Sequence, residues 1–229
     1  MHRRSLLAAL AAAPLVARTA TAAPVPVLIE LFTSQGCNSC PRADAALARL
    51  AARPDVLPLA FHVTYWDRLG WRDTLGDGRF DQRQRWYGSL LGTGAYTPQA
   101  VVAGELDLVG SDPRLEQALA LVAARRMPAT IAIGGDAVAV LPEVEATAPL
   151  RLTALGFDPH HKVAIGRGEN AGREIDYVNA VRSIADLGPW DGGSRSVSLG
   201  AVAAGGRGLV LLAQDPGTGR IAALGHRAA

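Results

Sequence analysis

Two cysteines are the residues of this chain best suited to chemistry. Cys37 and Cys40 are the only cysteines among 229 residues, and Asn38 and Ser39 separate them. Residues 41–53 carry apolar side chains at helical spacing, so the pair stands at the start of a helix. Free N–H groups and the positive end of the helix dipole favour a thiolate there. We expect Cys37 to be the more exposed, attacking thiol and Cys40 to resolve the mixed disulfide.

Two other roles for the cysteine pair stay open. An exported protein can carry a structural disulfide, although one that joins residues three apart closes too small a loop to stabilise much. The pair could also hold a soft metal ion, copper above all, as part of a metal-handling or partner-binding module. No recognisable ligand spacing is found among the histidines, which include His62, His160, His161 and His226. We expect a redox-active dithiol with no metal and no cofactor.

Three further residues could act beside the cysteines. Asp44 lies four residues after Cys40, on the same side of the helix, so its carboxylate could exchange a proton with Cys40. Thr97 and Pro98 come just before a predicted strand. We expect a cis peptide bond there that turns the backbone of Thr97 toward the substrate, against the alternative of an ordinary trans proline in a turn.

Substrate contacts are expected from residues on either side of the cysteine helix. Tyr65 and Trp66 close the second predicted strand, at the sheet edge where the cysteines lie. With Asn38 and Ser39 they could line a substrate groove, although a packing role for Trp66 is equally open. Residues 168–172, a polar pair bounded by glycines, suit a hairpin tip that either folds over the cysteine site or simply connects two strands.

The order of predicted elements describes the scaffold. Strands at 25–33, 56–64, 100–103 and 106–109 alternate with helices at 41–53, at 79–91 and from about 113 to 126. This order predicts an α/β domain over residues 24–126, a four-stranded sheet covered by three helices. Residues 127–229 hold short apolar stretches separated by turn residues, which predicts an all-β, sandwich-like second domain. We expect a chain that ends near residue 126 to keep its dithiol chemistry.

The N-terminus has the three regions of a signal peptide, which we assign to residues 1–23. Arg3 and Arg4 precede an apolar run too short to span a bilayer, so the mature protein is expected to be periplasmic or secreted without a membrane span. The arginines fit twin-arginine export, but Sec signals also begin with arginines. Removing Arg3, Arg4 and Arg18 changes the net charge from +2 to about −1. A mature chain with this near-neutral charge does not have the excess of basic residues that is typical of nucleic-acid-binding proteins.

Several motifs resemble a family of bacterial secreted proteins catalogued only as domain of unknown function twelve twenty-three. These are residues 32–41 with the cysteine pair, Ala43-Asp44, residues 62–67, Gly70-Trp71, residues 96–99 and residues 168–170. The resemblance covers nearly the whole mature chain and implies a thioredoxin-like fold, βαβαββα in residues 24–126, without an assigned substrate. In thioredoxin-like folds a cis-proline stands opposite the cysteines, where Pro98 is expected. Asn38 and Ser39 replace the Gly-Pro of thioredoxin, which leaves the redox potential and the thiol or disulfide partners open.

Overall fold

The computed structural model describes residues 25–125 and 128–228, and every structural statement below concerns these residues. The predicted signal peptide, residues 1–23, lies outside them. Along the chain the elements are β1 (Val27–Thr33), α1 (Cys40–Leu50), β2 (Val56–His62), the 3-10 helix η1 (Asp67–Leu69), α2 (Gly78–Leu91), β3 (Gln99–Val102), β4 (Leu106–Val109), α3 (Leu115–Ala123), β5 (Ala129–Thr130), β6 (Ala132–Ile133), β7 (Val138–Leu141), β8 (Leu150–Ala164), β9 (Glu174–Trp190), β10 (Arg195–Ser198), α4 (Gly200–Ala203), β11 (Gly208–Gln214) and β12 (Ile221–Arg227). The predicted order of strands and helices is confirmed as far as α3, and only η1 was not predicted.

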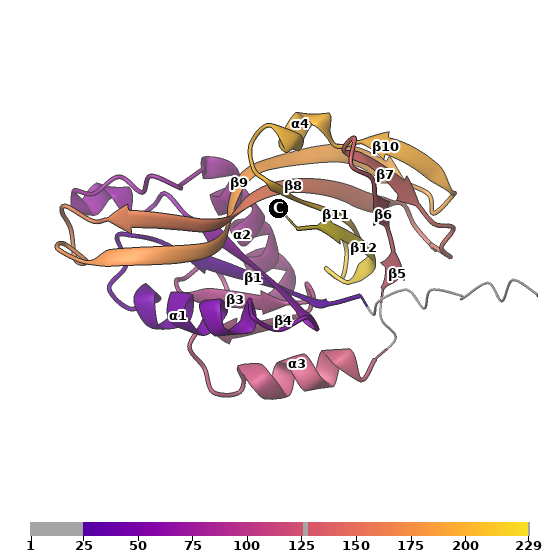
Figure 1. Cartoon of the computed structure of the whole chain (residues 1–229). Helices are drawn as coiled ribbons and strands as arrows, with labels where there is room; N and C mark the ends of the chain where they lie inside the picture. The colour runs from indigo at the N-terminus through magenta and orange to yellow at the C-terminus, as the bar shows by residue number, and fades with distance from the viewer. Residues whose placement is uncertain (1–24, 126–127, 229) are drawn as a thin grey trace, which may run out of the picture.

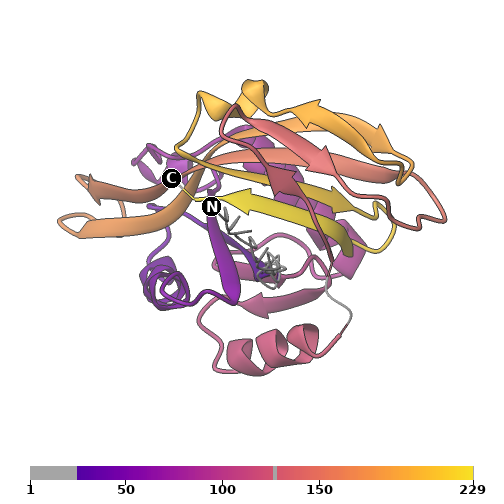
Figure 2. The same cartoon turned by 45° about the vertical axis from the view of Figure 1, so that its right-hand side comes forward.

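Strands from both halves of the chain build one large sheet. Nine strands follow the order β4-β3-β1-β2-β9-β8-β11-β12-β5, and β10-β7-β6 form a second sheet. α1 connects β1 to β2, and these two strands pair in parallel. β3 pairs antiparallel with both β1 and β4. Figures 1 and 2 show the strands of the second half continuing from those of the first. The protein is therefore a mixed α/β fold with few helices.

The second half does not form the separate all-β sandwich expected for residues 127–229. β9 pairs with β2 through Ala180 and Ala60, so strands of the second half extend the first sheet. β2 would otherwise leave an unpaired edge, and such an edge readily accepts another strand. The two sheets still pack against each other as in a sandwich where Leu141 of β7 and Leu152 of β8 lie in one apolar cluster. The sequence indicated these strands but not the edge that they join.

Successive side chains of β1 point to opposite faces of the sheet, and helices cover both faces. Ile29 lies in one apolar cluster with Leu47 of α1 and Leu119 of α3. Phe32 points to the other face and lies in a second cluster with Tyr87 of α2. Side chains an odd number of residues apart in a strand point to opposite faces, which explains this division. None of the helices in the described ranges is long and apolar enough to cross a membrane.

β8 and β9 form a long antiparallel hairpin that reaches past α1 (Figure 1). Its tip contacts residues 35–40, which we call the cysteine segment. The sequence predicted separate strands at 150–155 and 162–165, but β8 continues through the residues between them. Gly156 marks a shift in the pairing with β9. A Cβ atom at this position would clash with the carbonyl oxygen of Val202 in α4. Gly156 therefore permits a close backbone approach within a continuous strand and does not mark a turn.

Candidate functional site

The two cysteines form a disulfide at the N-terminal end of α1. Cys37 and Cys40 are bonded, with their Cα atoms 5.4 Å apart, and Cys40 is the first residue of the helix. Ser39 is the N-cap residue, but its side chain makes no capping hydrogen bond. Its hydroxyl lies 3.2 Å from the sulfur of Cys37 instead. The first turn of α1 holds no acidic residue, so no side chain of that turn offsets the positive end of the helix dipole next to the cysteines.

Both cysteines are buried in the disulfide state. The exposed fraction is 1% for Cys37 and 0% for Cys40, so the expected greater exposure of Cys37 is not found. Asn38 and Ser39, between them, are exposed. The physical reason is that residues before Cys37 are covered by other segments. Gly36 allows Trp66 to pack so closely that an added Cβ atom would lie 3.0 Å from the Cβ of Trp66.

The tip of the β8–β9 hairpin folds over the cysteine segment. Asn170 is fully buried, and its side-chain nitrogen donates to the carbonyl oxygens of Gln35 at 2.9 Å and Cys37 at 2.8 Å. A side-chain oxygen of Glu169 accepts a hydrogen bond from the backbone N–H of Asn38 at 3.1 Å. These contacts decide between the two roles left open for residues 168–172. In the sequence, the polar pair Glu169-Asn170 between two glycines is the only sign of this contact.

Trp66 connects the cysteine segment with Thr97. Its indole N–H donates to the Thr97 hydroxyl at 2.7 Å, while its Cβ packs against Gly36. The peptide bond between Thr97 and Pro98 is cis, as expected from the sequence. Tyr65 is half-buried and packs against the core on the α2 face. The structure thus brings Thr97 together with Trp66, which itself packs against the residue before Cys37, whereas Tyr65 packs against the core.

Asp44 is a buried carboxyl group inside α1. The Thr33 hydroxyl donates to one of its oxygens at 2.8 Å, and its other oxygen has no hydrogen-bond partner among the described residues. Burial raises the pKa of the Asp44 carboxyl to about 7, although the nearby His62 and the hydrogen bond from Thr33 act in the opposite direction. A carboxyl group with such a pKa can take up and release a proton near neutral pH. It lies one helical turn after Cys40.

His62 and Asp73 form a buried pair beneath the same region. The His62 Nδ1 atom lies 2.9 Å and 3.1 Å from the two oxygens of Asp73. Asp73 also accepts hydrogen bonds from the backbone N–H groups of Gln35 and Leu75. Burial on its own raises the pKa of Asp73, but His62 and these hydrogen bonds outweigh it and keep the pKa below its usual value. Because Asp73 is ionised, the Nδ1 atom of His62 carries the hydrogen.

The position of His62 explains its influence on Asp44. Thr33 and His62 are register partners in the parallel strands β1 and β2, so their side chains lie next to each other on the α1 face. The ring centres of Tyr177 and His62 lie 4.5 Å apart, and the buried Tyr177 hydroxyl has no hydrogen-bond partner within residues 25–125 and 128–228. Sequence reasoning assigned His62 to the interior but missed Asp73 and Tyr177. Asp73 lies in the loop after η1, two residues after the Gly70-Trp71 motif, and no spacing in the sequence marks it as a partner of His62.

Replacing Asp44 with asparagine should change how stability depends on pH. The native carboxyl titrates at about 7 and the unfolded one near 3.8, so the native state binds more protons between these values. The free energy of unfolding of the wild type should therefore fall as the pH rises through this window. Three pKa units correspond to about 4 kcal/mol. Denaturant titrations should give similar stability at pH 4 and a more stable Asp44→Asn variant at pH 8. Equal pH dependence of the two proteins would contradict the assignment, and Glu145→Gln, at an exposed carboxyl group, is the control.

Potential metal ligands do not assemble in the described part of the chain. No group of three or more histidine, cysteine, aspartate or glutamate side chains lies close enough there to share a metal ion. The described site holds a disulfide, the buried Asp44 carboxyl group and the buried His62–Asp73 pair.

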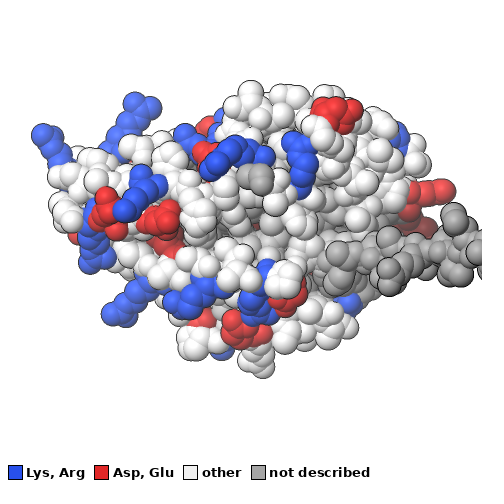
Figure 3. Space-filling model, viewed as in Figure 1, with Lys and Arg blue, Asp and Glu red and all other residues white. Residues whose placement is uncertain are grey.

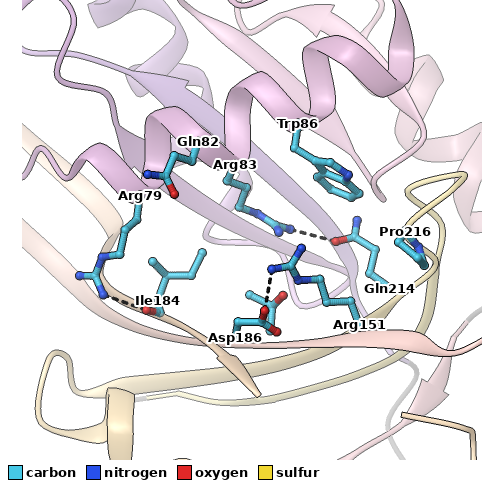
Figure 4. A pocket seen from close by; sticks show the side chains of 10 residues that line it. Arg79, Gln82, Arg83, Trp86, Arg151, Ile184, Asp186, Gln214 and Pro216 are labelled. Carbon is cyan, nitrogen blue, oxygen red and sulfur yellow. Dashed lines mark hydrogen bonds and ion pairs between the residues drawn. The ribbon is translucent and has the colours of Figure 1, made fainter. Parts of the chain in front are cut away.

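A separate cavity of about 300 Å³ lies between α2 and strands β8, β9 and β11 (Figure 4). Its charged side chains already have partners: Arg83 pairs with the buried Glu30, and Arg151 pairs with Asp186 at 2.6 Å. Figure 4 shows Arg83 directed at Gln214, which is 3.3 Å away. No residue of the cysteine segment lines this cavity, so it is not part of the disulfide site.

Comparison with known proteins identifies relatives of the same overall structure. Protein AGR_C_4864 from Agrobacterium tumefaciens, a crystal structure, is 29% identical, with a TM-score of 0.72 over 90% of this chain and 94% of that one. HBP35 of Porphyromonas gingivalis is 18% identical, with a TM-score of 0.63 over 88% of this chain and 74% of that one. At 18% identity, the similarity to HBP35 shows a shared fold and nothing more. No curated protein matches the sequence.

The family itself follows from the sequence. The family described as "Protein of unknown function (DUF1223)" matches residues 28–214, which include the cysteine pair, Trp66, the Thr97-Pro98 bond and the hairpin tip. This confirms the resemblance derived from the motifs. The chain therefore belongs to the DUF1223 family.

Proposed function

We propose that this protein is a thiol-disulfide oxidoreductase that uses Cys37 and Cys40. One observation carries the proposal: the disulfide stands at a helix N-terminus, one turn before the buried carboxyl group of Asp44, which has one oxygen without a hydrogen-bond partner in the described part of the chain. The helix end favours a thiolate at Cys37, because the first turn holds no carboxylate. Asp44 can exchange the proton of Cys40, since its pKa is raised to about 7.

We further infer that residues 25–125 form a thioredoxin-like unit within the large sheet. Three observations support this inference. The elements follow the order β1, α1, β2, α2, β3, β4, α3. The strands adopt the order β4-β3-β1-β2, in which β1 and β2 are parallel. The cysteine pair comes directly after β1, and Thr97-Pro98 comes directly before β3.

The reaction proceeds in two exchanges. In the reduced protein, the Cys37 thiolate attacks one sulfur of a partner disulfide, forms a mixed disulfide and releases one partner thiolate. Asp44 then accepts the proton of Cys40, and the Cys40 thiolate attacks the sulfur of Cys37. The second partner thiolate leaves and both thiolates take up protons. Two electrons pass from the cysteine pair to the partner disulfide, and the reverse sequence oxidises a partner dithiol.

The predicted signal peptide places this chemistry in the periplasm or outside the cell, where disulfides persist. There the partners are protein or small-molecule thiols and disulfides. Because both cysteines are buried in the disulfide state, a partner reaches the Cys37 sulfur only when a covering segment moves aside. The exposed backbone at Asn38 and Ser39 provides the nearest surface for a partner to approach.

The reduction potential of the Cys37–Cys40 disulfide tests the proposal. The mature protein is equilibrated with defined ratios of reduced and oxidised glutathione, and the fraction of free thiol is measured after acid quenching. We expect a potential between about −120 and −270 mV, the range of disulfide oxidoreductases. A potential below about −300 mV is typical of a structural disulfide and would contradict the proposal.

A further inference from the structure

We propose that the disulfide site selects partners that carry negative charge next to their sulfur atoms. The inference rests on the proposed function and names its substrate class. Its basis is a set of five exposed arginines around the cysteine segment, which we call the arginine rim. The rim consists of Arg42, Arg68, Arg72, Arg167 and Arg173.

Two members of the rim lie on the helices next to the disulfide. Arg42 is in the first turn of α1, two residues after Cys40. Arg68 belongs to η1, and its guanidinium carbon lies 5.8 Å from the centre of the Trp66 ring. The same tryptophan packs against Gly36, the residue before Cys37. Both arginines are therefore attached to elements that contact the cysteine segment.

The other three members lie at the hairpin tip and on the loop beneath it. Arg167 and Arg173 flank residues 168–172, the tip that binds the backbone of the cysteine segment through Glu169 and Asn170. Arg72 follows Trp71, whose indole N–H donates to the Gln35 side chain at 2.8 Å. Gly166 and Gly168 pack against the Trp71 side chain, which joins the loop to the tip.

The rim is positive because its charges are not neutralised by ion pairs. None of its five arginines pairs with an acidic side chain among residues 25–125 and 128–228, whereas Arg53, Arg114 and Arg151 elsewhere on the surface do. The acidic residues on the same segments are Asp44, Asp67, Asp73, Glu169 and Glu174. Asp44 and Asp73 are buried, Asp67 is half-buried, and Glu174 pairs with Lys162, which leaves Glu169 as the exposed carboxylate at the rim without an ion pair among the described residues. Figure 3 shows Lys and Arg side chains gathered toward the end of the molecule formed by the hairpin and α1.

A positive rim acts on both stages of an exchange reaction. It raises the local concentration of anionic partners, and such steering accelerates association by about 10- to 1000-fold at low salt. It also stabilises the thiolate that leaves when the mixed disulfide forms. Exposed charges are screened over about 10 Å at 0.1 M salt, so the preference must weaken as the ionic strength increases.

Three small disulfides of similar size test the inference with the full mature chain. They are bis(2-sulfonatoethyl) disulfide, a dianion, bis(2-hydroxyethyl) disulfide, which is neutral, and cystamine, a dication. For each probe, the second-order rate constant with the reduced protein is divided by the rate constant of the same probe with dithiothreitol. This ratio corrects for the intrinsic reactivity of the probe. At low salt we expect the dianion to react at least about tenfold faster than the neutral probe, within the range of electrostatic steering. The dication should be slowest, and 0.5 M salt should remove most of the difference.

Matched variants locate the effect. Arg68→Gln combined with Arg167→Gln should reduce the preference for the dianion several-fold, and Glu169→Gln should increase it. Arg49→Gln is the control, because Arg49 is exposed on the same helix but about 10 Å further from the disulfide than Arg42. Equal corrected rates for all three probes, unchanged by salt, would overturn the inference and leave the oxidoreductase proposal standing. If no probe reacts, both proposals fail.

Discussion

Replacing Cys37 with serine is expected to abolish exchange with partner disulfides, with a loss of at least about a thousandfold in rate. The thiolate is the nucleophile in this reaction, and a serine hydroxyl does not ionise near neutral pH. We expect Cys40 not to take over the role, because it is held in the first turn of α1 whereas Cys37 precedes the helix. The measurement is the second-order rate with bis(2-sulfonatoethyl) disulfide. Ser39→Ala is the matched control, since it removes only the hydroxyl beside the Cys37 sulfur.

The Cys40→Ser variant separates the roles of the two thiols. It should still attack a partner disulfide once, but without the resolving thiol the mixed disulfide at Cys37 should persist. Mass spectrometry of the intact protein should then show the mass of one bound partner thiolate. The opposite result, a stable adduct in Cys37→Ser and none in Cys40→Ser, would reverse the assignment of attacking and resolving cysteine.

A chain that ends at residue 125 is expected to lose its folded structure. The sequence suggested that residues 24–126 keep their dithiol chemistry alone, but the apolar core crosses the boundary between the two halves, so we expect the opposite. Phe61 and Phe80 lie in one apolar cluster with Phe157, Val181 and other side chains of the second half. Truncation would also leave β2 as an unpaired edge strand, since it removes β9.

The energetic argument concerns apolar surface. Each large side chain that loses its burial costs about 1.5–3 kcal/mol, and several are uncovered together. The total approaches or exceeds the 5–15 kcal/mol that stabilises a typical native protein. Thermal unfolding followed by circular dichroism should therefore show a cooperative transition for the mature full chain and none for the truncated one. A cooperative transition in the truncated chain, with the Cys37–Cys40 disulfide still exchangeable, would show that the first half folds by itself.

Features that depend on neighbouring residues were predicted from the sequence alone. The spacing of Cys37 and Cys40 at a helix start put their sulfur atoms within bonding reach, and the structure shows them joined in a disulfide. Hydrophobic periodicity predicted the elements up to α3 in their correct order. The helical spacing of Asp44 placed it one turn after Cys40, but its burial did not follow from the sequence.

Features that depend on distant segments were decided only by the tertiary structure. Asn170 contacts Cys37 across 133 residues of chain, and no local pattern reveals which edge a hairpin approaches. The pairing of β9 with β2 is of the same kind, because an apolar strand is compatible with several neighbours. The His62–Asp73 pair and the arginine rim likewise combine residues from separate loops. The sequence by itself therefore determined where the disulfide stands, whereas the tertiary structure decided what covers it, what titrates beneath it and which charges surround it.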